Sequence, residues 1–227
     1  MTARSSRDAE GRSLKRRVAI RTPRKTLLVV CEGTRTEPDY LNALKQQPAV
    51  HDVAAVDLRV ETGRGKTDPK NLVSLAVAAR NAAIDEDAEI DEFWCVFDVE
   101  WPTNHPGLHE AITQARNNSV EVAISNPCFE LWLILHFQDQ SAWLDSDDAC
   151  RLRARLDGSK GKGLAAAAYM SRTADAANRA KALDERHQLN NIRFPRNNPS
   201  CGMHHLLATM ESAQPEEPER ADAAPPG

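Results

Sequence analysis

Short apolar runs alternate with segments of helical spacing along the chain as far as residue 137. Runs of strand-forming residues occupy 27–31, 53–60, 93–97 and 120–124. Each precedes a segment whose apolar residues recur every three or four positions, over 37–46, from 69 to about 83, over 108–116 and from 127 to about 137. This β-α rhythm predicts an α/β fold over residues 26–140, with a mostly parallel sheet flanked by helices.

Polar residues mark where the helices are expected to begin. Asp68 before Pro69 predicts a capped start for the second helix, and Asn126 before Pro127 predicts one for the helix that reaches residue 137. From residue 145 onward the pattern is purely helical, over 149–156, 164–184 and 203–211, which predicts a C-terminal helical extension over 141–212. Residues 1–25 are expected to form a flexible arm and residues 213–227 a disordered tail.

The net charge of −4 hides an uneven distribution. Residues 1–25 contain nine Lys or Arg and two acidic residues, so the rest of the chain is strongly acidic. A basic arm of this kind binds a phosphate backbone through counterion release. The alternative is a solvated leader without a specific partner.

Composition excludes several classes of protein. The five cysteines are odd in number and lack C-x-x-C spacing, which argues against a disulfide framework and a zinc knuckle. No run approaches about twenty apolar residues, and no apolar segment follows the basic N-terminus, so neither a membrane span nor a secretory signal is expected. We therefore expect a cytoplasmic protein.

Acidic residues close two of the predicted strands. Glu32 follows the first strand, and Asp98 and Glu100 follow the third. Parallel sheets place ligand chemistry at these strand ends, and residues two apart on an extended chain point the same way, so we expect the three carboxylates to converge. They would repel one another without a cation or a proton between them, and their oxygen atoms suit Mg²⁺ or Mn²⁺. The alternative is that the three acids are unrelated and solvated.

Two resemblances rest on these residues. A glutamate after the first strand and an Asp-x-Asp after a later one resemble the TOPRIM arrangement of topoisomerases, primases and some nucleases, although Glu100 stands at the second Asp position. Three longer blocks resemble the RloB-like family: VCEGTRTEPDY at 30–40, FWCVFD at 93–98 and SNPCFELWLILHF at 125–137. The second resemblance covers nearly the whole folded chain.

Resemblance to the RloB-like family implies a TOPRIM-like Rossmannoid fold and a divalent-metal-dependent nuclease linked to prokaryotic anti-phage defence. The implied metal ligands are Glu32, Asp98 and Glu100, with Mg²⁺ or Mn²⁺ as the cofactor. The expected partner is nucleic acid, either DNA or RNA including tRNA, along with a protein of the same defence system or a second copy of the chain. The alternative is a non-catalytic module that senses a nucleotide or nucleic acid, which the departure at Glu100 favours.

Basic and hydroxyl residues near Glu32 are candidates for substrate contact. Thr34 and Arg35 suit a phosphate, and the Arg35 guanidinium is also a candidate catalytic group that neutralises developing charge. Lys160 and Lys162 lie in the glycine-rich segment 158–163, which is expected either to contact nucleic acid or to act as a plain connector.

The block at 125–137 supplies the remaining candidates. Ser125 and Asn126 end the fourth strand at an expected helix start, where free N–H groups attract anions. Glu130 lies one turn further on and is a candidate catalytic carboxylate. His136 is interpreted as a hydrogen-bonded core histidine, with acid–base catalysis as the alternative. Glu37 is interpreted as a helix-start residue that interacts with the helix dipole, with a role as a further acidic ligand as the alternative.

Two apparent motifs are rejected. The segment GRGKT at 63–67 ends like a P-loop, but the earlier glycine that a P-loop requires would fall at Val60. His105 and His109 have the spacing of helical metal ligands, but Pro106 and Gly107 lie between them and no third ligand is evident. A zinc site is therefore not expected there.

Overall fold

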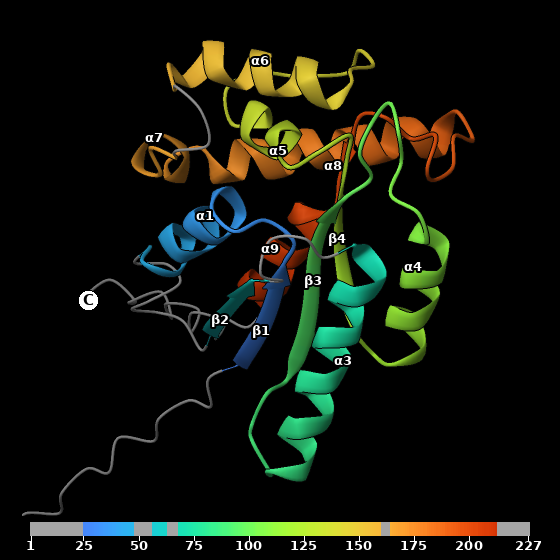
Figure 1. Ribbon diagram of the computed structural model, residues 1–227. Helices are drawn as coiled ribbons and strands as arrows, with labels where there is room; N and C mark the ends of the chain where they lie inside the picture. Colours follow the sequence, from blue (N-terminus) through green and yellow to red (C-terminus); the bar gives the residue numbers. More distant parts are fainter. Residues whose placement is uncertain (1–24, 48–55, 63–67, 160–163, 213–227) are drawn as a thin grey trace, which may run out of the picture.

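The computed structural model describes residues 25–47, 56–62, 68–159 and 164–212. These residues form an open sheet in the order β2-β1-β3-β4-β5 (Figure 1). The strands are β1 (Lys25–Cys31), β2 (Val56–Thr62), β3 (Glu92–Asp98), β4 (Glu121–Asn126) and β5 (Ser200–Cys201). The pairs β2–β1, β1–β3 and β3–β4 are parallel, and β5 pairs antiparallel with β4. The predicted α/β fold with a mostly parallel sheet is confirmed.

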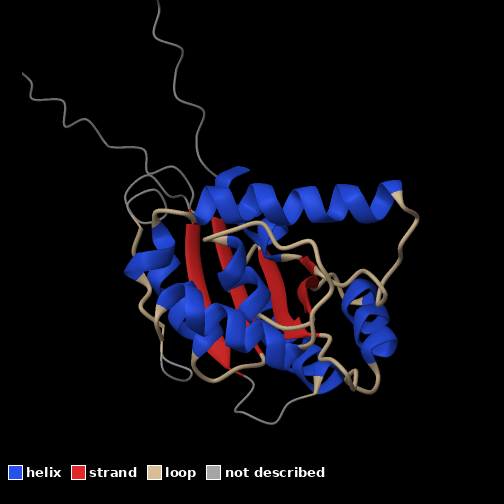
Figure 2. Ribbon diagram, turned by 90° about the horizontal axis from the view of Figure 1, so that it is seen from above, coloured by secondary structure: helices blue, strands red, loops and turns tan. Residues whose placement is uncertain are grey.

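Helices cover both faces of this sheet (Figure 2). They are α1 (Thr36–Lys45), α3 (Pro69–Asp85), α4 (Leu108–Asn117), α5 (Glu130–Leu135), α6 (Ser146–Asp157), α7 (Ala167–Met170), α8 (Thr173–Leu189) and α9 (Met203–Ser212). Alternate residues of β1 point to opposite faces, as the two-residue period of a strand requires. Leu27 and Val29 join the core beneath α1, α5, α8 and α9, whereas Leu28 and Val30 join the core beneath α3 and α4.

The predicted start of α3 is confirmed. Asp68 is the N-cap, its Oδ1 accepts a hydrogen bond of 3.0 Å from the Asn71 N–H, and Pro69 occupies the first helical position. The cap satisfies one of the N–H groups that the first turn of a helix leaves without a partner.

The predicted start of α5 is wrong, because Asn126 does not cap a helix. Its side chain is used elsewhere: Oδ1 accepts a hydrogen bond of 2.7 Å from Trp101 Nε1, and Nδ2 donates to the Pro195 carbonyl at 2.9 Å. The α-helix begins only at Glu130, where Phe129 is an N-cap without a side-chain hydrogen bond.

The C-terminal region is also not purely helical. Ser200 and Cys201 form β5, and the Gly202 N–H donates to the Ile124 carbonyl at 2.9 Å, which fixes this segment to the edge of the sheet. The single helix expected over 164–184 is interrupted after Met170, where the Arg172 N–H closes a turn on the Tyr169 carbonyl, and α8 then begins at Thr173.

The C-terminal helices share a core with the sheet. Tyr169, Ala180 and Leu206 belong to the same buried cluster as Leu27 of β1 and Tyr40 of α1. The boundary drawn near residue 140 on the sequence therefore lies within one continuous hydrophobic core. No helix in the described part of the chain is long and apolar enough to cross a membrane.

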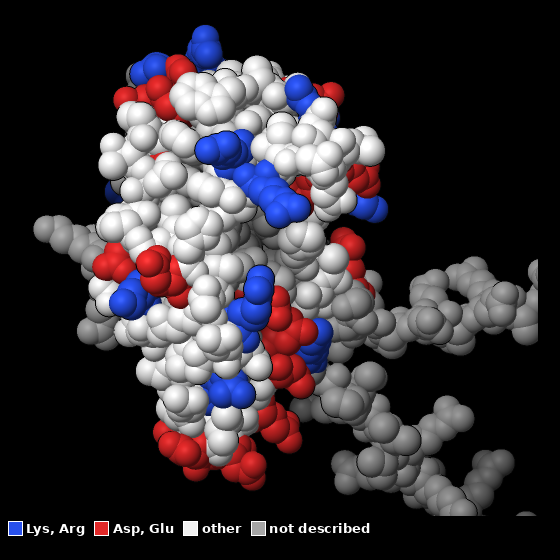
Figure 3. Space-filling model, turned by 90° about the vertical axis from the view of Figure 1, so that its right-hand side faces the viewer, with Lys and Arg blue, Asp and Glu red and all other residues white. Residues whose placement is uncertain are grey.

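The surface on the side of α4 carries charges of both signs. Figure 3 shows Lys and Arg side chains next to Asp and Glu across this face, with acidic side chains gathered at its lower end. A continuous basic surface of the kind that binds a phosphate backbone is therefore not seen on this face.

Candidate metal and phosphate site

The parallel pairing of β1 with β3 brings the predicted carboxylates to one end of the sheet. Cys31 pairs with Val96, so Glu32 and Asp98 both lie just beyond the paired residues, at the carboxyl ends of adjacent strands. The backbone continues this register, because the Glu32 N–H donates to the Val96 carbonyl at 3.0 Å and the Asp98 N–H donates to Glu32 Oε2 at 3.2 Å.

These residues open into a pocket of about 250 Å³, called the acidic pocket below. It is lined by Glu32, Gly33, Thr34, Arg35, Thr36, Glu37, Asp98, Glu100, Cys128, Phe129, Glu130, Ser146 and Cys150. The lining thus includes all four predicted carboxylates together with Thr34 and Arg35. The expectation that the carboxylates share one edge of the sheet agrees with this geometry.

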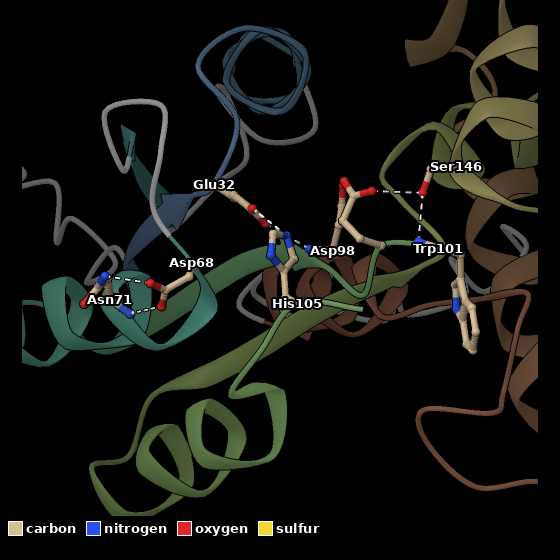
Figure 4. Close-up of polar contacts among 8 residues, drawn as sticks. Glu32, Asp68, Asn71, Asp98, Trp101, His105 and Ser146 are labelled. Atoms are coloured by element: carbon tan, nitrogen blue, oxygen red, sulfur yellow. Dashed lines mark hydrogen bonds and ion pairs between the residues drawn. The ribbon is translucent and has the colours of Figure 1, made fainter. Parts of the chain in front are cut away.

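Glu32 is held from two sides. Its Oε2 accepts the Asp98 N–H, and its Oε1 lies 2.9 Å from Nε2 of His105, in the loop after β3 (Figure 4). Burial raises the pKa of Glu32 above its ordinary value, although the His105 ring and the Asp98 N–H counteract the rise. His105 therefore belongs to the site as a neighbour of Glu32, a position that its spacing from His109 does not indicate.

Glu37 also belongs to the pocket. It lies in the first turn of α1, as predicted, but its side chain is buried and turned toward Gly33. A Cβ atom at position 33 would collide with the Glu37 carboxylate, so glycine is what allows this close approach. Burial raises the pKa of Glu37 to about 7, with Glu130 and Glu32 adding to the rise. Glu37 therefore lies at the start of a helix and also lines the acidic pocket, so its two interpretations are compatible.

Asp98 is a buried carboxylate of the pocket that lacks a full set of hydrogen-bond partners. Its relative exposure is 9%, and its Oδ1 is buried without a hydrogen-bond partner. Burial raises its pKa well above the ordinary value, and the negative charges of Glu37, Glu130, Glu32 and Glu100 raise it further. A buried acceptor without a donor is costly, and it needs either a proton or a cation to offset the cost.

Glu100 lines the pocket, but its backbone conformation differs from the extended one that was predicted. The strand ends at Asp98, and Glu100 has φ +63°, a left-handed conformation that costs a non-glycine residue on the order of 1–3 kcal/mol. Its N–H donates to the Pro127 carbonyl at 2.9 Å, and its Oε2 accepts the Ser146 hydroxyl at 3.1 Å. The expectation of an extended chain over 98–100 is wrong, and the two carboxylates still line one pocket.

The carboxylates of the pocket fit a hard divalent cation. The ligands are carboxylate oxygens, one of them buried without a partner, and they repel one another when ionised. Glu32, Asp98 and Glu100 do not, however, gather three ligand atoms within 4.8 Å in the described residues, as a preformed coordination sphere would. The group of the acidic pocket that does so is Cys128, Glu130 and Cys150.

The predicted phosphate contacts divide into three kinds. Thr34 and Arg35 are exposed at the pocket and available to a ligand. Ser125 and Asn126 are buried, with 0% and 1% exposure, and the Ser125 hydroxyl lies against Cys201 Sγ at 3.6 Å, so neither side chain faces the pocket. Lys160 and Lys162 lie outside the described residues.

His136 is a core histidine in this structure. It is 1% exposed, its Nδ1 lies 2.8 Å from the Trp132 carbonyl, and its Nε2 lies 3.1 Å from the Tyr40 hydroxyl. Burial lowers its pKa to about 4. The ring is thus neutral near pH 7 and fully partnered, as the structural interpretation of its position predicted.

One family profile, described as RloB-like protein, matches residues 27–210. The chain belongs to the RloB-like family. The match begins in β1 and ends in α9, so every residue that lines the acidic pocket lies inside it. No curated protein and no solved structure matches the chain.

Glu37 was undervalued on the sequence and His105 was missed, as were Ser146, Cys128 and Cys150. Glu37 lies in the same block as Glu32, and the spacing E-G-x-x-x-E was a usable signal, because a glycine beside a carboxylate leaves room for a second side chain. His105 lies in an irregular loop seven residues after Asp98, and periodicity carries no information there. Only the folded loop shows that His105 meets Glu32.

Proposed function

We propose that this RloB-like protein is a divalent-metal-dependent nuclease of prokaryotic anti-phage defence, with a TOPRIM-like arrangement of acidic residues at the ends of β1 and β3. The observation that carries the proposal is Asp98, whose buried Oδ1 lacks a partner among carboxylates at the carboxyl ends of parallel strands. That position is where open α/β sheets bind their ligands.

Glu32, Asp98 and Glu100 would hold Mg²⁺ or Mn²⁺, with Glu130 beside them. A bound ion of this kind acts as a Lewis acid, polarising the scissile phosphate and stabilising the leaving oxygen. The Asp98 N–H orients Glu32 through its 3.2 Å hydrogen bond, with His105 Nε2 2.9 Å from the other oxygen, and Ser146 orients Glu100 through the 3.1 Å hydrogen bond. These contacts hold the carboxylates in place before a cation arrives.

Arg35 and Thr34 would bind the substrate phosphate at the mouth of the pocket. The guanidinium supplies paired donors to phosphate oxygens and neutralises charge that develops in the reaction. The wider nucleic-acid contact is assigned to the basic N-terminal arm and to Lys160 and Lys162, whose positive charges suit a phosphate backbone. DNA or RNA, including tRNA, is the proposed substrate, with a protein of the same defence system or a second copy as partner.

The test is a cleavage assay on single- and double-stranded DNA, RNA and tRNA with Mg²⁺ or Mn²⁺. We expect cleavage by the wild type and a loss of about 10²-fold or more in Glu32→Gln and Asp98→Asn, because each removes a charged ligand of the ion. The matched control is Glu121→Gln, an exposed glutamate at the opposite end of the sheet, which should cleave normally. Equal rates in the wild type and Asp98→Asn would overturn the proposal.

A second candidate function is supported by the geometry of Glu100. Its carboxylate accepts the Ser146 hydroxyl, and the three predicted ligands do not form a close group. This arrangement favours a module that binds a metal–nucleotide complex and signals to a partner without cleaving. Calorimetry that shows metal-dependent nucleotide binding by the wild type, with no turnover of any substrate, would favour this function over the nuclease.

A further inference from the structure

A second cluster of potential metal ligands lies outside the acidic pocket, where α8 meets α9. Asp184 comes from α8, and His204 and His205 come from the first turn of α9, directly after β5. One ligand atom from each lies within 4.8 Å of the other two. None of these three residues lines the acidic pocket or has a role in the proposed nuclease function.

The distances within this cluster suit a shared ion better than direct hydrogen bonds. Asp184 Oδ2 lies 3.4 Å from His204 Nε2 and 3.6 Å from His205 Nε2. N–H···O hydrogen bonds are usually about 2.7–3.2 Å long, so both contacts are too long to be good ones. A tetrahedral ion with ligand bonds of about 2.0–2.1 Å sets neighbouring ligand atoms about 3.3 Å apart, which is close to the spacing observed.

A hydrogen bond behind the cluster orients one of the ligands. Nδ1 of His204 lies 2.8 Å from the Cys201 carbonyl, which can only accept, so this nitrogen carries the proton and Nε2 presents its lone pair toward Asp184. Metal-bound histidines commonly donate their second ring nitrogen to a backbone carbonyl in this way. The Cys201 carbonyl belongs to β5, so the edge of the sheet fixes the ring.

The cluster has both a buried and an accessible side. His204 is 10% exposed, Asp184 is 27% exposed and His205 is 61% exposed, which leaves a path for an ion from solvent. Asp184 also lines a cavity of about 450 Å³, whose wall includes Arg116 and Arg193. Three protein ligands leave a fourth tetrahedral position for water or an anion.

We propose that Asp184, His204 and His205 form a binding site for a transition-metal ion of the Zn²⁺ class. Zn²⁺ accepts a set of two imidazoles and one carboxylate, whereas Mg²⁺ prefers a set made of oxygen ligands alone. The ion links α8 to α9 beside β5. This site is independent of the acidic pocket and of the proposed nuclease function.

The test uses Co²⁺ as a spectroscopic substitute for Zn²⁺, added to the chelator-treated full chain under reducing conditions. We expect one equivalent to produce the visible absorption of a tetrahedral nitrogen–oxygen site, and Zn²⁺ to abolish that absorption by competition. Asp184→Asn and His205→Gln should each weaken binding by at least about tenfold, because even the loss of an outer-shell partner costs about 10–100-fold in affinity. Since His205 is largely exposed, its replacement leaves the packing intact, and thermal unfolding without metal verifies this.

Two controls separate this site from the other candidate ligands. Glu185→Gln removes a charge from the exposed neighbour of Asp184 and should leave the absorption unchanged. Asp98→Asn should also leave it unchanged, because it alters only the acidic pocket. The proposal is overturned if Asp184→Asn binds Co²⁺ like the wild type, or if the spectrum shows sulfur-to-metal charge transfer that Cys150→Ser abolishes, which would place the ion at Cys128, Glu130 and Cys150.

Discussion

Asp98 and Asp157 are both buried carboxylates, and their surroundings are opposite. The Asp157 side chain is 1% exposed and lies 2.8 Å from Arg153 Nε, and its Oδ2 accepts the Tyr169 hydroxyl. Asp98 has no cationic side chain against it among the described residues, and its Oδ1 has no partner at all. The Asp157 carboxylate therefore has hydrogen-bond and ion-pair partners, whereas the Asp98 carboxylate has one oxygen without any partner.

The two pKa shifts follow from these surroundings. Burial raises the pKa of Asp157, but hydrogen bonds from Tyr169 and Ser159 and the charge of Arg153 outweigh it and leave the pKa below its ordinary value. For Asp98, burial and the neighbouring glutamates act in the same direction and raise the pKa. Burial alone therefore does not set the direction of the pKa shift, whereas the presence or absence of a compensating partner does.

The strongest test of this contrast compares Asp157→Asn with Asp98→Asn in the absence of divalent metal at pH 8. We expect Asp157→Asn to lower the free energy of unfolding by about 3–5 kcal/mol, because it removes the buried negative charge that lies 2.8 Å from Arg153 Nε and accepts the Tyr169 hydroxyl. Asp98→Asn should leave the stability unchanged or raise it, because the amide carries no charge for the neighbouring glutamates to repel. Urea unfolding followed by circular dichroism measures both.

A conservative control uses an exposed aspartate. Asp39→Asn, on the solvent side of α1, should change the stability by less than about 0.5 kcal/mol. The contrast fails if Asp98→Asn destabilises the metal-free protein as much as Asp157→Asn does, because Asp98 would then be a structural carboxylate as well.

The parts of this molecule that the sequence predicts are those set by periodicity. The apolar runs at 27–31 and 93–97 became the adjacent parallel strands β1 and β3, and their register alone brings Glu32 and Asp98 together. The Asp68–Pro69 cap was predictable for the same reason, because it depends on neighbours in the chain. The local sequence pattern and the parallel topology of the sheet are therefore enough to predict that Glu32 and Asp98 lie close together.

What the sequence does not predict depends on contacts between distant segments. Asn126 had every local feature of a helix cap, but its side chain is hydrogen-bonded to Trp101 and to the Pro195 carbonyl instead. β5 is two residues long and exists only because Gly202 approaches β4 closely. His105 meets Glu32 through an irregular loop. These features result from tertiary packing, and no spacing along the chain indicates them.

The acidic pocket should make the stability of the metal-free protein depend on pH through Glu37. The pKa of this carboxyl rises from 4.5 in the unfolded chain to about 7 in the fold, so the folded state binds the proton more tightly. Its stabilising contribution is therefore complete below about pH 4.5 and is lost as the pH rises through 7. The loss is about 3 kcal/mol for a shift of this size.

Thermal unfolding of the wild type and Glu37→Gln at pH 5.5 and 8 in chelator measures this contribution. Other groups also titrate in this range, so the informative quantity is the difference between the two proteins. We expect Glu37→Gln to gain stability relative to the wild type as the pH rises, and Asp39→Asn, altered in the same turn of α1, to show no such gain. Parallel pH profiles for the wild type and Glu37→Gln would remove Glu37 from the site.

The smallest expected effect is the stabilisation of the fold by Mg²⁺. It tests whether a cation is the partner that Asp98 Oδ1 lacks in the metal-free protein. An ion that binds only the folded state at ten times its dissociation constant stabilises the fold by about 1.4 kcal/mol. The stabilisation should be larger at pH 8 than at pH 6, because protonated Glu32, Glu37 and Asp98 must release their protons before they bind the ion. Thermal unfolding with and without Mg²⁺, at constant ionic strength, tests both statements.

Asp98→Asn should abolish the Mg²⁺-dependent rise in the unfolding temperature, and Glu121→Gln should retain it. An equal rise in Asp98→Asn would show that Mg²⁺ stabilises the protein from somewhere other than the acidic pocket.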